Sequence, residues 1–316
     1  MQARICIYRN HERVHMTREF ACPSKTREMQ TNHFDSTIWN DFVFRDDDII
    51  ISTYAKSGTT WMQQIIGQML LGPNPELPTN QISPWVDLRV PPKAVKLPEL
   101  EAQAHRRFLK THLPVDALVF SPKAKYLYIG RDGRDVVWSL HNHHLNGNEA
   151  YYDVLNNSPG LVGPPMERCD PDIHRYWQTW FERDGHPHWS LWDNVRSWWA
   201  IRDLPNVKLI HFNDLKRDMR RQMAEIAAFL AIEVDPDDWD EIALYCSFDW
   251  MRAHGDKAVP LGGAMWEGGA STFINKGVNG RWQSILSDAE SAAYEERAKA
   301  ELGGECARWL ASGERV

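Results

Sequence analysis

The chain has 316 residues, of which 43% are hydrophobic and 25% charged, and its 36 Lys and Arg against 43 Asp and Glu give a formal net charge of −7 at pH 7. These values exclude global disorder, collagen-like repeats and a small disulfide scaffold, and the length allows one large domain or two of medium size. The acidic balance argues against a general nucleic-acid binder, although a local basic pocket can still hold a small anion.

Short apolar strands alternate with helices from about residue 47 onward. Strands are predicted at residues 48–52, 107–110, 125–129 and 207–212, and helices at residues 60–71, 135–145, 189–202, 215–230 and 287–302. Strands that are apolar along their whole length are typical of a parallel sheet covered on both faces. We therefore predict an α/β fold, P-loop-like, in which a central parallel sheet of about five strands lies between two helical layers, α/β/α.

The stretches between these elements divide the chain. Residues 1–35 are predicted to be a polar N-terminal extension, and residues 36–316 to form a single domain. Three insertions rich in Pro, Asn or Gly interrupt the domain at about residues 72–104, 146–190 and 255–272. Long loops are often functional, and the Gly-rich third insertion indicates a mobile segment.

The five cysteines are far apart and include no CxxC pair. This usage is typical of a reducing compartment, and it argues against a disulfide framework and a structural zinc. No run of about 18 apolar residues occurs, and the N-terminus has no apolar stretch, so we expect neither a membrane span nor a signal peptide. We therefore expect a cytoplasmic protein.

A turn of small and hydroxyl-bearing residues joins the first predicted strand to its helix, where residues 52–61 are STYAKSGTTW. In such a turn the backbone N–H groups and the N-terminus of the helix converge on one point, which favours an anion. Lys56 adds a positive charge there. The turn is not a Walker A loop, because Thr53 and Thr59 stand where that motif needs Gly and Lys. Taken alone, it predicts a phosphate-type site, with an ordinary strand–helix turn as the alternative.

This turn resembles the 5′-phosphosulfate loop (TYPKSGTTW) of cytosolic-type sulfotransferases, which move a sulfonate group from 3′-phosphoadenosine 5′-phosphosulfate (PAPS) to an alcohol, phenol or amine and leave PAP. Further segments resemble motifs of the same family, in the same order. They are residues 108–114 (FLKTHLP), 126–139 (YLYIGRDGRDVVWS), 194–199 with 207–216, 246–251 (CSFDWM) and 273–282 (FINKGVNGRW). The resemblance covers about residues 36–310.

Sulfonate transfer resembles phosphoryl transfer and needs a base for the acceptor's proton and a cation for the departing phosphate oxygen. His112, just past a strand end, suits the base, and Lys56 suits the cation. Lys110 lies two residues before His112 and points the same way on an extended strand, so we expect it to steady the transferred group. The resemblance further implies that Ser139 restrains Lys56. The PAPS-binding residues it implies are Lys56, Ser57, Gly58, Thr59, Thr60, Trp61, Arg131, Ser139, Trp192, Cys246, Phe248, Met251, Phe273, Asn275, Lys276 and Gly277. This mechanism requires no metal.

The sequence departs from the family pattern at the edge of the nucleotide site. Trp192 stands where the family often has Tyr, and Cys246 where it has Thr. Asn275 replaces an Arg, so one positive charge is lost, and Lys276 is expected to contribute more of the binding of the 3′-phosphate. The short dimer motif of the family is not recognisable in residues 282–290, so a homodimer remains open.

Two alternatives to a sulfotransferase remain, a P-loop kinase of small molecules and a non-catalytic PAPS- or nucleotide-binding protein. The kinase needs a Walker A lysine and an acidic Mg²⁺ ligand, of which the first is absent. Lys56, Lys110, His112 and Ser139 together argue against lost chemistry.

The acceptor is predicted from the insertions, which are the parts least similar to the family. Their aromatic side chains favour a small-molecule hydroxyl acceptor that is aromatic or apolar, such as a phenol or a lipid-like alcohol, although aromatics also line sugar sites. His141, His143 and His144 follow the 3′-phosphate motif without a third acidic or thiol ligand nearby, so contact with the acceptor is favoured over metal binding.

Overall fold

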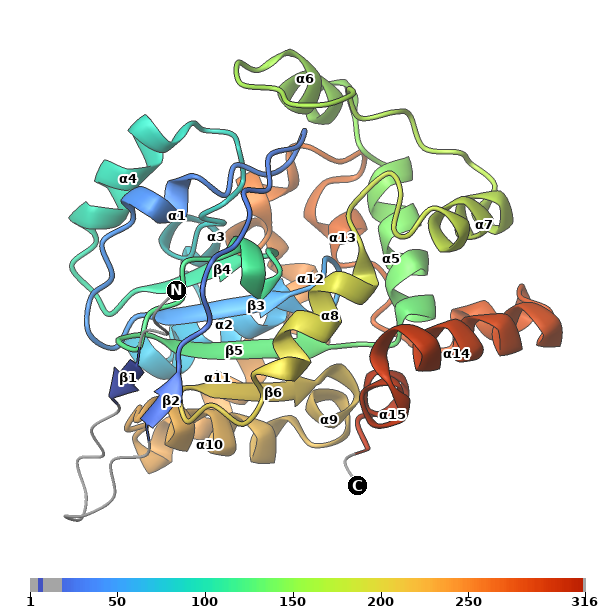
Figure 1. Ribbon diagram of the computed structural model, residues 1–316. Helices are drawn as coiled ribbons and strands as arrows, with labels where there is room; N and C mark the ends of the chain where they lie inside the picture. The colour runs from blue at the N-terminus through green and yellow to red at the C-terminus, as the bar shows by residue number, and fades with distance from the viewer. Residues whose placement is uncertain (1–4, 8–18, 315–316) are drawn as a thin grey trace.

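The computed structural model describes residues 5–7 and 19–314, and its centre is a parallel sheet of four strands in the order β4-β3-β5-β6 (Figure 1). The strands are β3 (Ile49–Thr53), β4 (Phe108–Thr111), β5 (Lys125–Gly130) and β6 (Val207–His211). Ser52 pairs with Thr111 on one side and with Tyr128 on the other, so the carboxyl ends of the strands meet at one edge of the sheet. The expected parallel sheet of about five strands thus has four within the described residues, because the chain offers only four such buried runs.

Helices connect these strands and cover the sheet. They are α1 (Ile38–Asp41), α2 (Thr59–Leu71), α3 (Thr79–Ile82), α4 (Lys93–Ala102), α5 (Gly133–Leu145), α6 (Glu149–Asn157), α7 (Ile173–Glu182), α8 (Leu191–Ala200), α9 (Phe212–Arg217), α10 (Met219–Leu230), α11 (Trp239–Tyr245), α12 (Phe248–Ala253), α13 (Gly269–Phe273), α14 (Asp288–Leu302) and α15 (Gly304–Ser312). A short antiparallel pair, β1 (Ile5–Ile7) and β2 (Glu19–Ala21), precedes them.

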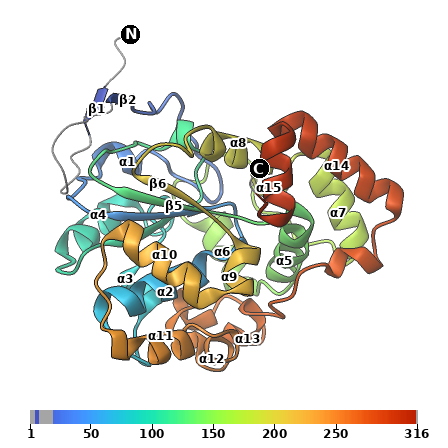
Figure 2. The same ribbon diagram turned by 90° about the horizontal axis from the view of Figure 1, so that it is seen from below.

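Two cores lie on opposite faces of the sheet, as strand alternation requires. Ile49 and Ile51 belong to a core that includes the apolar sides of α2 and α10, which lie together below the sheet in Figure 2. Ile50 belongs to the other core, with Trp198 of α8 and Trp309 of α15. All three isoleucines are fully buried, which confirms the three-layer α/β/α prediction.

Most predicted elements lie within two residues of their predicted ends, with two kinds of difference. The helix predicted over residues 215–230 is two helices, because Asp218 leaves helical geometry and its carboxylate accepts the Arg221 N–H to cap α10. The insertions contain helices α3, α4, α6 and α7. The third insertion is packed rather than loose, since Val259 is fully buried and Trp266 is 6% exposed.

The N-terminal part of the chain packs on the domain from residue 22 onward. His33 and Phe34, which fall within the predicted extension, are buried beside Trp189. Arg89 holds this region by donating to the backbone carbonyls of Asn32, Leu155, Ser158 and Pro159. The described part of the 1–35 extension is therefore packed against the domain, because Phe34 belongs to its hydrophobic core.

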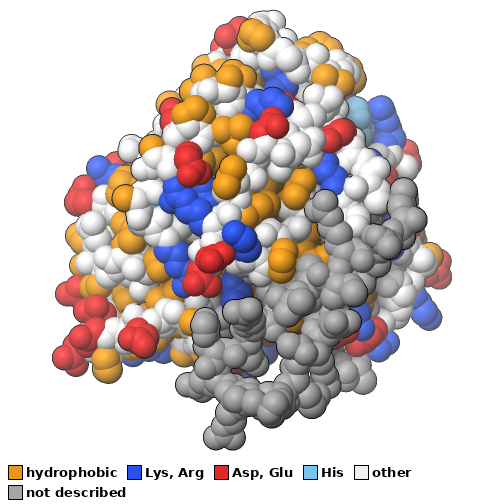
Figure 3. Space-filling model, turned by 60° about the vertical axis from the view of Figure 1, so that its left-hand side comes forward, with side chains coloured by type: hydrophobic (Ala, Val, Ile, Leu, Met, Phe, Trp, Pro, Cys, Tyr) orange, Lys and Arg blue, Asp and Glu red, His pale blue; other side chains and the backbone are white. Residues whose placement is uncertain are grey.

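Cys22 is disulfide-bonded, which is a single cross-link and not the disulfide framework that the cysteine spacing argues against. Cys169, Cys246 and Cys306 are free. No helix in the described ranges is both long and apolar enough to span a bilayer. On the face in Figure 3, basic side chains alternate with acidic and apolar ones rather than forming one broad basic patch.

Candidate active site

The turn between β3 and α2 forms an anion cradle at the carboxyl edge of the sheet. Gly58 has φ of +107°, and a Cβ atom there would lie 3.0 Å from the Phe212 ring, so this position requires glycine. The Oγ1 atoms of Thr53 and Thr59 are 2.7 Å apart and close the turn across its base. The start of the 13-residue helix α2 thereby faces the same point as the side chains of the turn.

Lys56 lies in this turn with φ of +63°. Its Nζ atom is 3.4 Å from His143 Nδ1 and 3.8 Å from the centroid of the Phe273 ring, while its carbonyl accepts the Arg131 Nη1–H at 2.9 Å. Burial, followed by the charges of Lys110 and Arg131, lowers the pKa of Lys56 to about 7. The ammonium group is therefore poorly solvated, and an anionic ligand would stabilise its charged form.

Ser139 has no hydrogen bond to Lys56 within the described residues. The contact expected of Ser139 is made instead by His143, which lies one turn later on α5. The sequence predicts a contact of His143 with the acceptor, and its contact with Lys56 is not predicted.

His112 lies just after β4, 5% exposed, with its Nδ1 atom 2.7 Å from the Thr53 carbonyl oxygen. A carbonyl can only accept, so Nδ1 carries the hydrogen and Nε2 keeps the lone pair. Asn194 donates to the His112 carbonyl at 2.9 Å and is itself held by the Tyr128 hydroxyl. Burial, with the charge of Lys110, keeps the pKa of His112 well below its usual value, so the imidazole is neutral.

Lys110 lies two residues before His112 on β4, with its Nζ atom 5.0 Å from the Trp85 ring centroid. Burial lowers the pKa of Lys110 to about 8, although Asp87 opposes this. Asp87 accepts hydrogen bonds from Trp85 Nε1 at 2.8 Å and from the backbone N–H of His112 at 3.5 Å. Asp87 and Asn194 thus position His112 from two sides, a role that a single sequence does not reveal.

The Arg131 guanidinium is 8% exposed and lies 4.4 Å from the Phe212 ring centroid. It donates from Nη2 to Asn279 Oδ1 at 2.8 Å, whereas its Nε atom is buried without a partner in the described chain. An unsatisfied buried donor on a charged group is costly, and an anionic ligand would satisfy it. The residues present therefore fit a phosphate-bearing ligand at this point.

The expected nucleotide residues fall into two groups. Trp61 donates its indole N–H to the Cys246 carbonyl, and Phe248 lies against Gly277, where a Cβ atom would be 2.5 Å from the ring. These residues, with Lys56 to Thr60, Arg131 and Phe273, gather at the carboxyl edge of the sheet. Met251 and the Cys246 side chain are buried, Asn275 is half-buried, and Trp192 is 2% exposed and packed on Tyr294.

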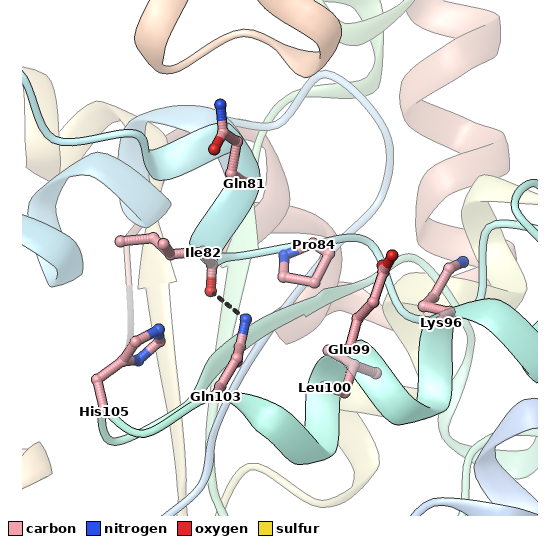
Figure 4. A pocket seen from close by; sticks show the side chains of 8 residues that line it. All are labelled: Gln81, Ile82, Pro84, Lys96, Glu99, Leu100, Gln103 and His105. Carbon is pink, nitrogen blue, oxygen red and sulfur yellow. Dashed lines mark hydrogen bonds between the residues drawn. The ribbon is translucent and has the colours of Figure 1, made fainter.

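Two cavities are found, one bordered by a predicted site residue and one not. Lys276 lines one of about 540 Å³, together with Trp138, His141, Asn142, Leu145, Ile173, Arg281, Ser284 and Ile285. The other, of about 320 Å³, lies between α3 and α4 (Figure 4). Its lining consists of Gln81, Ile82, Pro84, Lys96, Glu99, Leu100, Gln103 and His105, so none of the predicted site residues borders it.

No group of three or more His, Cys, Asp or Glu side chains in the described part of the chain is placed to hold a metal ion. His141 and His144 each direct Nε2 to a backbone carbonyl, of Asp170 and Glu167 respectively.

Comparison with known proteins agrees with this geometry. Residues 46–305 match the family model described as the sulfotransferase domain. A glycolipid sulfotransferase of Mycobacterium tuberculosis is 29% identical over 306 aligned positions, and the match covers 89% of this chain and 93% of the relative. Sulfotransferase 1C2 of Rattus norvegicus is 28% identical over 276 aligned positions, and the match covers 83% of this chain and 86% of the relative.

Solved structures show the same fold. A mouse sulfotransferase, SULT7A1, complexed with PAP superposes with a TM-score of 0.67 at 23% identity, covering 87% of this chain and 92% of that one. A retinol dehydratase in complex with androsterone and PAP gives 0.65 at 20% identity, covering 84% and 83%. The matched family model spans well over half of the chain and includes the β3–α2 turn, His112 and Arg131. The chain therefore belongs to the sulfotransferase family, as an enzyme that transfers a sulfonate group from PAPS to a small-molecule acceptor.

Proposed function

We propose that His112 is the base of this transfer and that Lys56 stabilises the negative charge of the leaving group. In an in-line displacement, the acceptor oxygen bonds to sulfur while the bond from sulfur to the phosphate oxygen breaks. His112 Nε2 takes the acceptor's proton, because the Thr53 carbonyl holds the hydrogen on Nδ1. Lys56 neutralises the charge that grows on the departing oxygen. The single observation that supports this best is the fixed tautomer of a buried neutral imidazole beside the β3–α2 turn.

The remaining donor contacts are assigned in the same proposal. The turn from Ser57 to Thr60 holds the 5′ side of PAPS through backbone N–H groups and hydroxyls. Arg131, with its unpartnered Nε, and Ser139 bind the 3′-phosphate, and Lys276 closes it from the side of Gly277. Trp61 and Phe248 border the adenine. Lys110 steadies the transferred sulfonate.

For the acceptor we propose a hydroxyl on a molecule with an aromatic or apolar body. The support is the set of indole rings next to the base, with Trp85 4.7 Å and Trp189 5.7 Å from His112 by ring centroids. The mycobacterial relatives are named for glycolipids, which belong in any acceptor panel. A homodimer and a cytoplasmic location stay predictions.

The test is transfer of labelled sulfonate from PAPS to phenols, sterols, aliphatic alcohols, sugars and glycolipids, with wild type beside His112→Ala. We expect wild type to transfer and the variant to lose at least about a hundredfold in kcat while binding PAP as tightly, since general-base catalysis contributes on that scale. Equal rates for both would remove His112 from the mechanism. Protection against thermal unfolding by ATP-Mg²⁺ but not by PAP would instead favour a kinase.

A further inference from the structure

Four histidines from distant parts of the sequence meet beside the proposed active site. They are His33 before α1, His143 and His144 on α5, and His188 in the turn before α8, and we refer to them as the histidine cluster. Ring centroids are 5.6 Å apart for His33 and His188, and 5.8 Å for His144 and His188. His143 is close enough to the other three for each to lower its pKa.

Several polar atoms in and around the cluster are buried without a partner among the described residues. They are both ring nitrogens of His188, Nδ1 of His144 and the hydroxyl of Tyr151. His144 Nε2 faces the Glu167 carbonyl at 2.7 Å, so Nε2 carries the hydrogen and Nδ1 is an acceptor that lacks a donor. Buried polar atoms are nearly always paired, so this concentration of unpaired ones indicates a ligand or bound water.

The imidazoles of the cluster are electrically neutral. Burial is the first cause in every case, and it lowers the pKa of His144 to about 4 and that of His33 to about 3. The pKa values of His143 and His188 are also well below the usual range. A neutral imidazole offers one donor and one acceptor, whereas it offers no positive charge to a carboxylate or phosphate.

The cluster adjoins both reacting centres. His143 Nδ1 is 3.4 Å from Lys56 Nζ. The Trp189 ring contacts both His188 and His112, with centroids 5.8 Å and 5.7 Å away. Trp266, 4.8 Å from the His143 ring, adds another flat apolar surface. The cluster is therefore linked to Lys56 through His143 and to His112 through Trp189.

We propose that the histidine cluster and the Tyr151 hydroxyl form the part of the acceptor site that binds a neutral polyhydroxylated ring, such as a sugar, attached to the aromatic or apolar body proposed above. This inference rests on the proposed function of the same site. A hydroxyl is the neutral group that both donates and accepts, as the unpaired atoms of His188 and His144 require. A simple phenol or sterol has one hydroxyl, which binds at His112, so the unpaired atoms of His188 and His144 would stay without a partner. Sites built to bond a substrate hydroxyl reject analogues that lack it by large factors.

The experiment compares 4-nitrophenol with 4-nitrophenyl β-D-glucoside as acceptors of labelled sulfonate from PAPS. The glucoside has no free phenol, so any transfer goes to a sugar hydroxyl. We expect its kcat/KM to exceed that of 4-nitrophenol by at least about tenfold. Tyr151→Phe, which removes only the unpartnered hydroxyl, should lower this ratio at least about fivefold, and so should His188→Phe.

The matched control is Tyr152→Phe. The two tyrosine rings are neighbours, but the Tyr152 hydroxyl already donates to the His144 carbonyl at 3.0 Å. The control is expected to leave the ratio of the two acceptors unchanged, even where it lowers stability. Similar use of both acceptors, or an equal loss for both in Tyr151→Phe, would mean that water alone pairs these atoms and would overturn the inference. Failure to transfer to any acceptor would contradict the proposed function instead.

Discussion

Lys56 titrates near neutral pH, because its pKa is lowered to about 7. Only the protonated form can neutralise a departing phosphate oxygen, so kcat/KM of the free enzyme should fall as pH rises through about 7. His112 is already neutral throughout this range, since its pKa is well below 6.5, and it adds no acidic limb there. Lys56→Arg should abolish the alkaline fall near pH 7, because a guanidinium stays charged. A pH profile of kcat/KM from pH 5.5 to 9 checks both outcomes.

His143 contacts Lys56, whereas Ser139 makes no hydrogen bond with it among the described residues, so His143 should influence that profile more than Ser139 does. His143→Ala opens the surroundings of Lys56 to water and should move the alkaline limb to higher pH, since burial is the main cause of the low pKa. Ser139→Ala should leave the limb in place while weakening PAP binding. Identical shifts in the two variants would contradict this division of roles.

Arg131 ties the turn to the C-terminal segment and keeps one unpaired donor. Arg131→Lys retains the charge but loses the fork that reaches Lys56 O and Asn279. We expect the Kd for PAP to rise about tenfold or more, which corresponds to about 1.4 kcal/mol. Isothermal titration calorimetry measures it, with Arg217→Ala on the exposed side of α9 as the control that should bind PAP normally.

Among the elements, the break between α9 and α10 depends on one carboxylate. Asp218 accepts the Arg221 N–H at 3.0 Å, so Asp218→Ala should lower the free energy of unfolding by about 1 kcal/mol without altering activity. Urea unfolding gives this value. Asp46→Ala, which removes an exposed ion pair with Lys123, should change it by less than about 0.5 kcal/mol.

Local patterns predicted the strands and the β3–α2 turn well, because a buried apolar strand and a turn that requires glycine depend on residues that are adjacent in the sequence. Helix α7 was missed, although Tyr176, Trp177 and Trp180 form its buried stripe, since the surrounding Pro, Gly and Asn indicated a loop. The histidine cluster could not be predicted. Its members are brought together only by packing of the N-terminal segment and the insertions on α5.

At the scale of the whole molecule, Arg89 links the N-terminal segment to the end of α6 through four carbonyls, and it is 5% exposed. Arg89→Met should loosen both regions together, because a buried methionine leaves those carbonyls unpaired. We expect faster hydrogen exchange in residues 30–36 and 153–160 and a higher acceptor KM, with the Kd for PAP unchanged. A change confined to one of the two regions would contradict the link.

The hydrogen on His112 Nδ1 is held by a main-chain carbonyl, that of Thr53, rather than by a side chain. Substitution at position 53 cannot remove that oxygen, so the reactive tautomer is inherited with the path of β3 and not with any one amino acid. Substitutions on the acceptor side can therefore change the acceptor without removing the main-chain oxygen that fixes the tautomer of the proposed base.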